Sequence, residues 1–124
     1  MKKLNILLLL LFISFNLFSQ NNNQTESQLE RIITTRINDS IQIDLFFAEP
    51  VNPKTITSAN IYINGKNINS NTKFTYNRDG TQVRFLIDYT DSFNLKLENI
   101  QTNTQKLITT EIIILNGATT WKKS

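Results

Sequence analysis

Apolar and polar residues alternate with a period of two along most of the chain from Leu29 to Leu115. In the segment 41–47 one phase is wholly apolar: Ile41, Ile43, Leu45 and Phe47. Successive side chains of a strand point to opposite faces of a sheet, so this period predicts half-buried antiparallel strands. Ile and Thr are abundant, and no segment shows the 3.6-residue period of an amphipathic helix. We therefore expect an all-β fold.

Turn-forming residues divide this alternation into short segments. The predicted strands are 31–37, 41–47, 61–63, 66–68, 73–76, 82–89, 93–98 and 107–115. Asn64-Gly65, between two of them, predicts a type I′ hairpin, and Gly80 is placed for a positive φ in the turn 77–80. About seven strands with regularly spaced turns predict an immunoglobulin-like antiparallel β-sandwich, with a small barrel as the alternative.

The N-terminus predicts export. Lys2 and Lys3 precede the apolar run 4–17, and the small residue Ser19 follows, which is the pattern of a cleaved signal peptide over residues 1–19. A transmembrane span is the alternative, but polar residues interrupt the run. No cysteine follows it, which excludes a lipid anchor. We expect a flexible leader at 20–28, the sandwich at 29–116 and a C-terminal tail at 117–124. The expected location is periplasmic, cell-surface or extracellular.

Charge and composition exclude several classes of function. The formal charge of +3 includes Lys2 and Lys3, so a chain from residue 20 has 13 − 2 = 11 basic and 10 acidic residues, or +1. Nucleic-acid binding needs clustered cations, which are lacking. The chain has no Cys and no His, which excludes disulfides, Ser-His-Asp and Cys-His catalysis, and His-based metal sites.

The alternation stops at Glu49-Pro50, and a second proline follows at Pro53. Proline donates no N–H to a sheet, so the strand ends here, and 53–60 is predicted to be a compact turn with a short 3₁₀ piece. The stretch "DSIQIDLFFAEPVNPKTITSANIYI" resembles the first half of the SbsA-type bacterial immunoglobulin-like domain. The matching residues are Phe47, Glu49, Pro50, Val51, Pro53, Thr55, Ile56 and Asn60.

The resemblance extends more loosely over residues 32–115, through "NRDGTQVRFLI" and "FNLKLENI". It departs from the family at "QTNTQK", where the family has Asp-x-x-Gly-Asn. Domains of this family occur mainly as repeated modules of secreted or surface-attached bacterial proteins, as spacers, adhesion elements or enzyme accessories. The resemblance therefore implies a structural or binding module, although a single copy fits a spacer poorly.

Acidic residues are the remaining candidates for chemistry. Asp39 and Asp44 lie on either side of a strand start, and Asp88 and Asp91 flank a two-residue segment. Such pairs suit a glycosidase-like reaction or an oxygen-ligated calcium ion. The alternative, which we favour, is that Asp39, Asp79 and Asp91 are turn residues that hydrogen-bond their own backbone. We assign no catalytic residue, metal ligand or cofactor.

Other residues leave alternatives open. Glu49 either caps backbone N–H groups of the segment 54–58 or is a solvated carboxylate. Trp121 either anchors a partner or folds back onto the sandwich. Four apolar residues fall on the outward phase of their strands: Phe46, Leu86, Ile113 and Leu115. Together they would form a partner surface; the alternative, which we favour, is a β-bulge or cover by a loop.

The first functional hypothesis is a secreted, non-enzymatic module of a bacterial envelope that contacts a protein or glycan. The second is a small hydrolase or calcium-dependent lectin that uses the acidic pairs. The third is a subunit that completes its sheet in a larger assembly by strand addition at an exposed edge. The sequence identifies neither the binding residues nor the oligomeric state.

Overall fold

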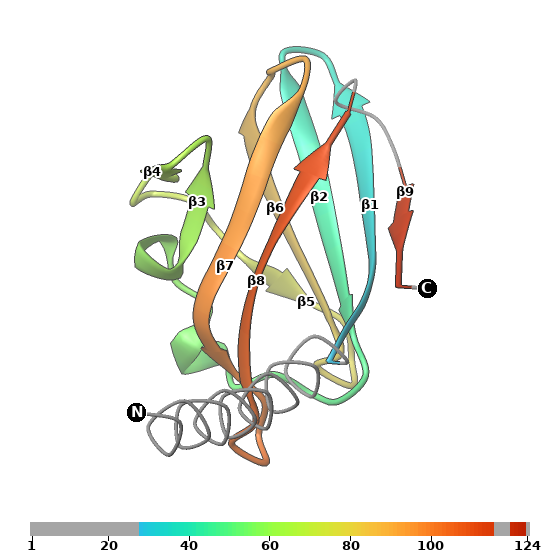
Figure 1. Cartoon of the computed structure of the whole chain (residues 1–124), viewed down its shortest axis with the longest axis vertical. Coiled ribbons are helices and arrows are strands. Elements are labelled where there is room, and N and C mark those ends of the chain that lie inside the picture. The colour runs from blue at the N-terminus through green and yellow to red at the C-terminus, as the bar shows by residue number, and fades with distance from the viewer. Residues whose placement is uncertain (1–27, 116–119, 124) are drawn as a thin grey trace, which may run out of the picture.

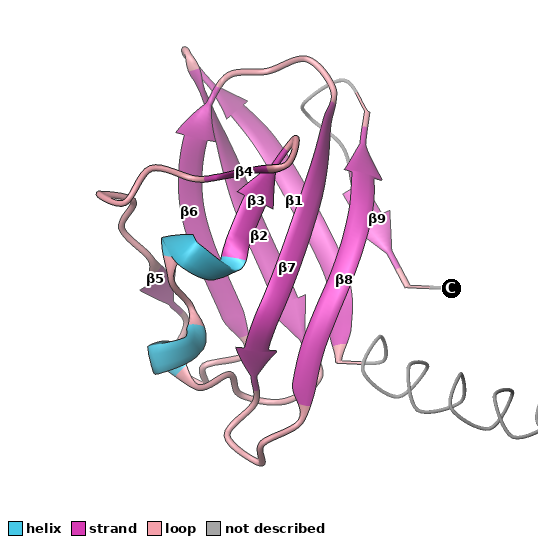
Figure 2. Cartoon of the chain, turned by 60° about the vertical axis from the view of Figure 1, so that its left-hand side comes forward, coloured by secondary structure: helices cyan, strands magenta, loops and turns pink. Residues whose placement is uncertain are grey.

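In the computed structural model, which describes residues 28–115 and 120–123, the alternating segments form the strands of two antiparallel sheets (Figure 1). The strands are β1 (Leu29–Ile37), β2 (Ser40–Phe47), β3 (Ile61–Ile63), β4 (Lys66–Asn67), β5 (Thr75–Tyr76), β6 (Gln82–Asp88), β7 (Phe93–Gln101), β8 (Leu107–Ile114) and β9 (Thr120–Lys122). Two short 3₁₀ helices, Pro53–Thr55 and Ser58–Asn60, precede β3 (Figure 2). Within the described residues, no helix is long and apolar enough to cross a membrane.

The order of the strands is that of an immunoglobulin-like sandwich. One sheet has the order β5-β6-β2-β1-β9, and the other has the order β4-β3-β7-β8. With β1 to β8 matched to strands A, B, C, C′, D, E, F and G, the first sheet contains A, B, E and D, and the second contains C′, C, F and G. The two sheets face each other as layers in Figures 1 and 2, so the predicted fold class is confirmed and the barrel is not formed.

The core lies between the sheets and uses the residues that the alternation places on the inner phase. The buried apolar side chains are Leu29, Ile32, Ile41, Ile43, Leu45, Phe47, Val51, Ile56, Ile61, Ile68, Val83, Phe85, Phe93, Leu95, Leu97, Ile100, Ile108, Ile112 and Ile114. Burial of one such side chain contributes about 1.5–3 kcal/mol to the free energy of unfolding. Phe74 and Trp121 pack against this core from its margins.

The two prolines mark the passage of the chain from one sheet to the other. Val51 N–H donates to the Gly80 carbonyl next to the first sheet (2.9 Å), and Asn52 N–H donates to the Gln101 carbonyl of β7 in the second (2.8 Å). Thr55 Oγ1 then accepts from Gln101 N–H at 3.0 Å. The turn predicted after Pro50 is therefore a crossover that joins the ends of both sheets.

Both predicted glycine turns are confirmed. Asn64 and Gly65 have φ values of 53° and 82°, as a type I′ turn between β3 and β4 requires. Gly80 has a φ of 75°. Asn77 closes the loop before β6, since its Oδ1 accepts from the N–H groups of Thr81 (2.9 Å) and Gln82 (3.0 Å).

Two predicted segments need correction. Thr120–Lys122, expected in the tail, form β9, which pairs antiparallel with β1 so that Trp121 lies opposite Ile32. Three residues are too few for a recognisable period, so the pairing comes from tertiary contacts with β1. The strand expected at 73–76 is shortened to β5, although Phe74 does turn inward and meets the Phe85 ring edge-on at 5.4 Å.

Residues 1–27, 116–119 and 124 lie outside the described residues. The predicted signal peptide, all but the last residue of the predicted leader, and part of the predicted tail therefore have no structural counterpart here.

Candidate functional site

The predicted pair of Asp39 and Asp44 is not brought together. Asp39 lies in the turn between β1 and β2, and Asp44 lies inside β2. At about 3.3 Å per residue, five positions along a strand correspond to roughly 16 Å. This separation exceeds the range for paired glycosidase carboxylates, about 5–9.5 Å.

Asp44 has a structural role on the outer face of the first sheet. Its Oδ1 accepts from Arg84 Nε at 2.7 Å and from Gln82 Nε2 at 3.3 Å, and its Oδ2 accepts from Gln42 Nε2 at 3.3 Å. The hydrogen bond and the charge of Asp44 raise the pKa of the Arg84 guanidinium. Asp44 is therefore a buried carboxylate, paired with Arg84, that links β2 to β6.

The other acidic residues predicted to lie in turns do so, with different bonding. Asp79 lies in the turn between β5 and β6, and Asp91 lies in the bend before β7. Asp91 Oδ1 accepts from the Tyr89 hydroxyl at 3.4 Å rather than from backbone, and Asn77 makes the side-chain-to-backbone bonds at its turn. Asp88 ends β6. In the part of the chain that the structure describes, no three acidic residues gather in a group able to hold a metal ion.

Glu49 does not cap the 3₁₀ helix; its carboxylate stays partly exposed to solvent but has side-chain partners. The 3₁₀ helix is capped by Asn52, whose Oδ1 accepts from Lys54 N–H at 3.1 Å. Glu49 instead accepts from the Thr104 hydroxyl (2.7 Å) and forms an ion pair with Lys106. These hydrogen bonds, that from Lys106 above all, lower the pKa of the Glu49 carboxyl from its usual 4.5. Glu49 thus ties the crossover to the β7–β8 loop, the segment where the family resemblance departs.

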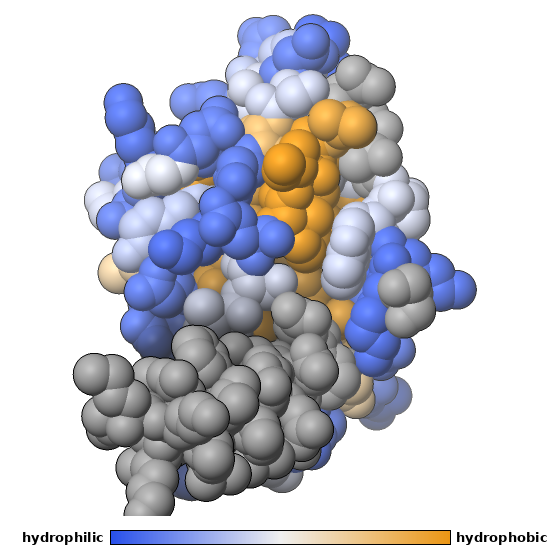
Figure 3. All heavy atoms as spheres, in the orientation of Figure 1, coloured by the Kyte–Doolittle hydropathy of each residue, from blue (hydrophilic) through white to orange (hydrophobic). Residues whose placement is uncertain are grey.

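The outward apolar residues do not form one patch. Phe46 is partly covered by Arg31, whose guanidinium carbon lies 4.2 Å from its ring centre. Leu86 is 51% exposed on β6 of the first sheet. Ile113 and Leu115, at 68% and 59% exposed, lie at the end of β8 in the second sheet. The only pair that remains together is Ile113 and Leu115, and Figure 3 shows hydrophobic surface over this part of β8.

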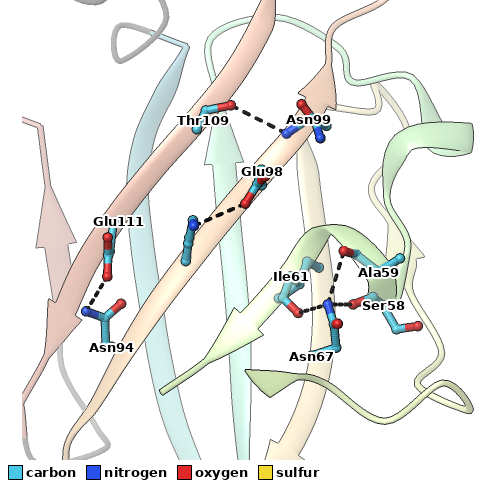
Figure 4. Close-up of polar contacts among 10 residues, drawn as sticks. Ser58, Ala59, Ile61, Asn67, Asn94, Glu98, Asn99, Thr109 and Glu111 are labelled. Atoms are coloured by element: carbon cyan, nitrogen blue, oxygen red, sulfur yellow. Dashed lines mark hydrogen bonds and ion pairs between the residues drawn. The ribbon is translucent and has the colours of Figure 1, made fainter. Parts of the chain in front are cut away.

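One surface groove, about 470 Å³, lies between the β3–β4 hairpin and the end of β6. Its lining is rich in asparagine, but these side chains already hold the local backbone. Asn67 Nδ2 donates to the carbonyls of Ser58 and Ala59, both at 3.0 Å (Figure 4). Asn69 Oδ1 accepts from Asn71 N–H at 2.8 Å. Two of the asparagines that line the groove therefore have a structural role that needs no ligand.

A second groove, about 520 Å³, lies between β8 and β9. Residues 110–113 of β8 form one wall, and Leu29 with residues 121–123 form the other. Trp121, left undecided by the sequence, folds back onto the sandwich: it is partly buried and packs against the core. This groove marks the side of the sandwich where both sheets end.

The free edge of β8 is the most distinctive surface here. β8 pairs with β7 and with no other described strand. The hydrogen bonds of β7 show which way the β8 backbone faces. Asn64 N–H donates to the Asn94 carbonyl (2.9 Å) beside the pair Ile63–Leu95, so that pair is not itself hydrogen-bonded. The N–H and C=O of Leu95 therefore point to β8, where its partner is Ile112.

Because directions alternate along a strand, the residues flanking Ile112 point their N–H and C=O groups away from β7. The other end of β8 agrees: Thr102 N–H donates to the Lys106 carbonyl (3.0 Å) beside the pair Gln101–Leu107, which is again not hydrogen-bonded. The residues whose backbone groups face the free edge are thus Leu107, Thr109, Glu111 and Ile113. Their side chains lie on the exposed face of the sheet.

The sequence indicated part of this surface, because Ile113 and Leu115 fall on the outward phase of their strand. That β8 ends its sheet follows only from the strand order. Comparison with family models found no match, and no curated protein matches the chain.

Proposed function

We propose that this chain is a secreted, non-enzymatic immunoglobulin-like module of a bacterial cell envelope, which works by surface contact with protein through the β8 edge. The observation that carries the proposal is the free edge of β8 with the exposed side chains of Ile113 and Leu115 beside it. Contiguous exposed apolar side chains favour protein contact, because that contact removes apolar surface from water.

The residues support a binding role over a catalytic one. The chain has no His and no Cys. Among the described carboxylates, Asp44 and Glu49 are each paired with a cation. In the asparagine-rich groove, the side chains of Asn64, Asn67 and Asn69 are hydrogen-bonded to backbone, which favours protein over glycan as the partner. The N-terminal pattern of residues 1–19 and the resemblance of residues 39–63 to SbsA-type domains support export and an envelope location.

The test is short-range chemical cross-linking in the native host. The full chain, with its own signal sequence and a C-terminal affinity tag, is cross-linked in intact cells and recovered from envelope and medium fractions. The variant Ile113→Thr/Leu115→Thr places β-branched residues at both positions, which suits a strand, but removes the apolar surface there. The matched control is Leu86→Thr, which changes a leucine of the other sheet that is also more than half exposed.

We expect cross-linked protein species with the natural chain and the control, and their loss with the double variant. Recovery of the product without residues 1–19 would support export. Retention of the chain in the cytoplasm, or cross-links indifferent to the double variant, would refute the proposal.

A further inference from the structure

The free edge of β8 has few of the features by which edge strands avoid pairing. Natural edges are protected by proline, lysine, bulges or very short length. The other three edges have such features: β4 and β5 have two residues each, and β9 is short and followed by a second lysine. β8 has eight residues, no proline and no lysine. The register irregularity beside it is an extra residue of β7, not of β8.

The outward residues of β8 are complementary to themselves in the antiparallel direction. Only residues whose backbone faces the edge can form hydrogen-bonded pairs, namely 107, 109, 111 and 113. If Leu107 lies opposite Ile113 of a second copy, Thr109 lies opposite Glu111 of that copy, and two-fold symmetry repeats both pairs. The apolar side chains of Leu107 and Ile113 then face each other, and the Glu111 carboxylate faces the Thr109 hydroxyl rather than another charge.

The two neighbouring registers are less favourable. A shift of two residues in one direction places Glu111 opposite Glu111 of the second copy, and like charges directly opposite are destabilising. A shift of two residues in the other direction places Leu107 opposite Glu111, an apolar side chain against a carboxylate. Glu111 is held on this outer face because its Oε2 accepts from Asn94 Nδ2 of β7 at 2.7 Å (Figure 4). The pattern therefore favours the register with Leu107 opposite Ile113.

We propose that β8 is a self-association site at which two copies of this chain pair antiparallel, Leu107 against Ile113, and join their second sheets into one continuous sheet. This inference rests on the proposed function, and it identifies the protein that binds at the β8 edge as a second copy of the same chain.

The first experiment uses an engineered cysteine, which is the only thiol of the variant because the natural chain has no cysteine. In this register Thr110 lies on the two-fold axis opposite Thr110 of the second copy, in a non-hydrogen-bonded pair. Such pairs bring Cα atoms to about 4.5 Å, within the range that a disulfide spans. We expect Thr110→Cys to oxidise to a covalent dimer, and Thr109→Cys, which faces Glu111 instead, to remain largely monomeric.

The second experiment measures the dimer dissociation constant of the purified exported chain by sedimentation equilibrium. Thr109→Lys places a cation opposite Glu111 and should tighten the dimer, whereas Thr109→Glu places like charges opposite and should weaken it. Each substitution alters two cross-strand pairs of the dimer, so we expect the dissociation constants of the two variants to differ roughly tenfold. Both variants lose the 3.4 Å hydrogen bond from Asn99 N–H to Thr109 Oγ1. The difference between their dissociation constants therefore reports on the pair with Glu111 alone. Leu86→Lys is the control and should leave the constant unchanged.

The inference is wrong if the chain is strictly monomeric and its Thr110→Cys variant forms no covalent dimer. It is also wrong if Thr109→Lys and Thr109→Glu change the dissociation constant equally. If that chain still makes envelope cross-links that depend on Ile113 and Leu115, the proposed function stands and its partner is another protein. If those cross-links are also absent, both proposals fail.

Discussion

Replacement of Gly65 by valine tests the β3–β4 turn in the most direct way. Gly65 has a φ of 82°, which L residues rarely adopt, and a Cβ built there meets nothing within 4 Å. The cost of a side chain is therefore backbone strain without steric clash. The turn cannot relax freely, because Asn64 donates its N–H to the Asn94 carbonyl and accepts the Asn94 N–H on Oδ1, both at 2.9 Å.

Strain of this kind costs about 1–3 kcal/mol, and a β-branched residue suffers more than alanine or asparagine. We expect Gly65→Val to lower the free energy of unfolding by about 1–3 kcal/mol, Gly65→Ala by roughly 1 kcal/mol, and Gly65→Asn to change it by less than about 0.5 kcal/mol. Urea denaturation monitored by circular dichroism measures the series. A neutral valine variant, or an asparagine variant as unstable as the valine one, would refute the strain argument.

Three further measurements probe other parts of the structure. Because the hydrogen bonds from Lys106 and Thr104 lower the pKa of Glu49, its contribution to stability is present above the unfolded value near 4.5 and is lost as pH falls through the lowered folded value. Urea titrations between pH 7 and 3 should therefore show a shallower acid loss for Glu49→Gln than for the natural chain, and parallel curves would contradict this. Leu97→Ala, at a fully buried position, should destabilise by about 2–5 kcal/mol in the same assay, and a loss below 1 kcal/mol would be inconsistent with its burial. Thermal melting with calcium and with chelator should give the same midpoint, since a ligand that binds the folded state raises it; a clear rise with calcium would revive the lectin hypothesis.

Much of the fold could be predicted because its determinants are local. The two-residue period follows from strand geometry and identified the inner face of β2. The Asn64-Gly65 turn and the positive φ of Gly80 follow from which residues tolerate left-handed backbone. The prolines ended β2 because they have no N–H to donate.

The capping role considered for Glu49 was wrong, and its partners Thr104 and Lys106 could not be predicted because they lie 55 and 57 residues away in the chain. The strand β9 was missed because three residues carry too little periodicity, and its place beside β1 depends on a long-range pairing. Likewise, the cover over Phe46 is supplied by Arg31 of a neighbouring strand, which no local pattern indicates.

The sequence by itself determined that this chain forms strands, where they turn and which faces they bury, because side-chain period and turn backbone are properties of a few adjacent residues. Only the tertiary structure decided which strands become neighbours and which remain at an edge. The order of strands depends on pairing between distant segments, and an edge is defined by the absence of a described neighbour. The sequence showed that Ile113 points outward from its strand. It did not show that this strand, β8, lies at an unprotected edge of its sheet.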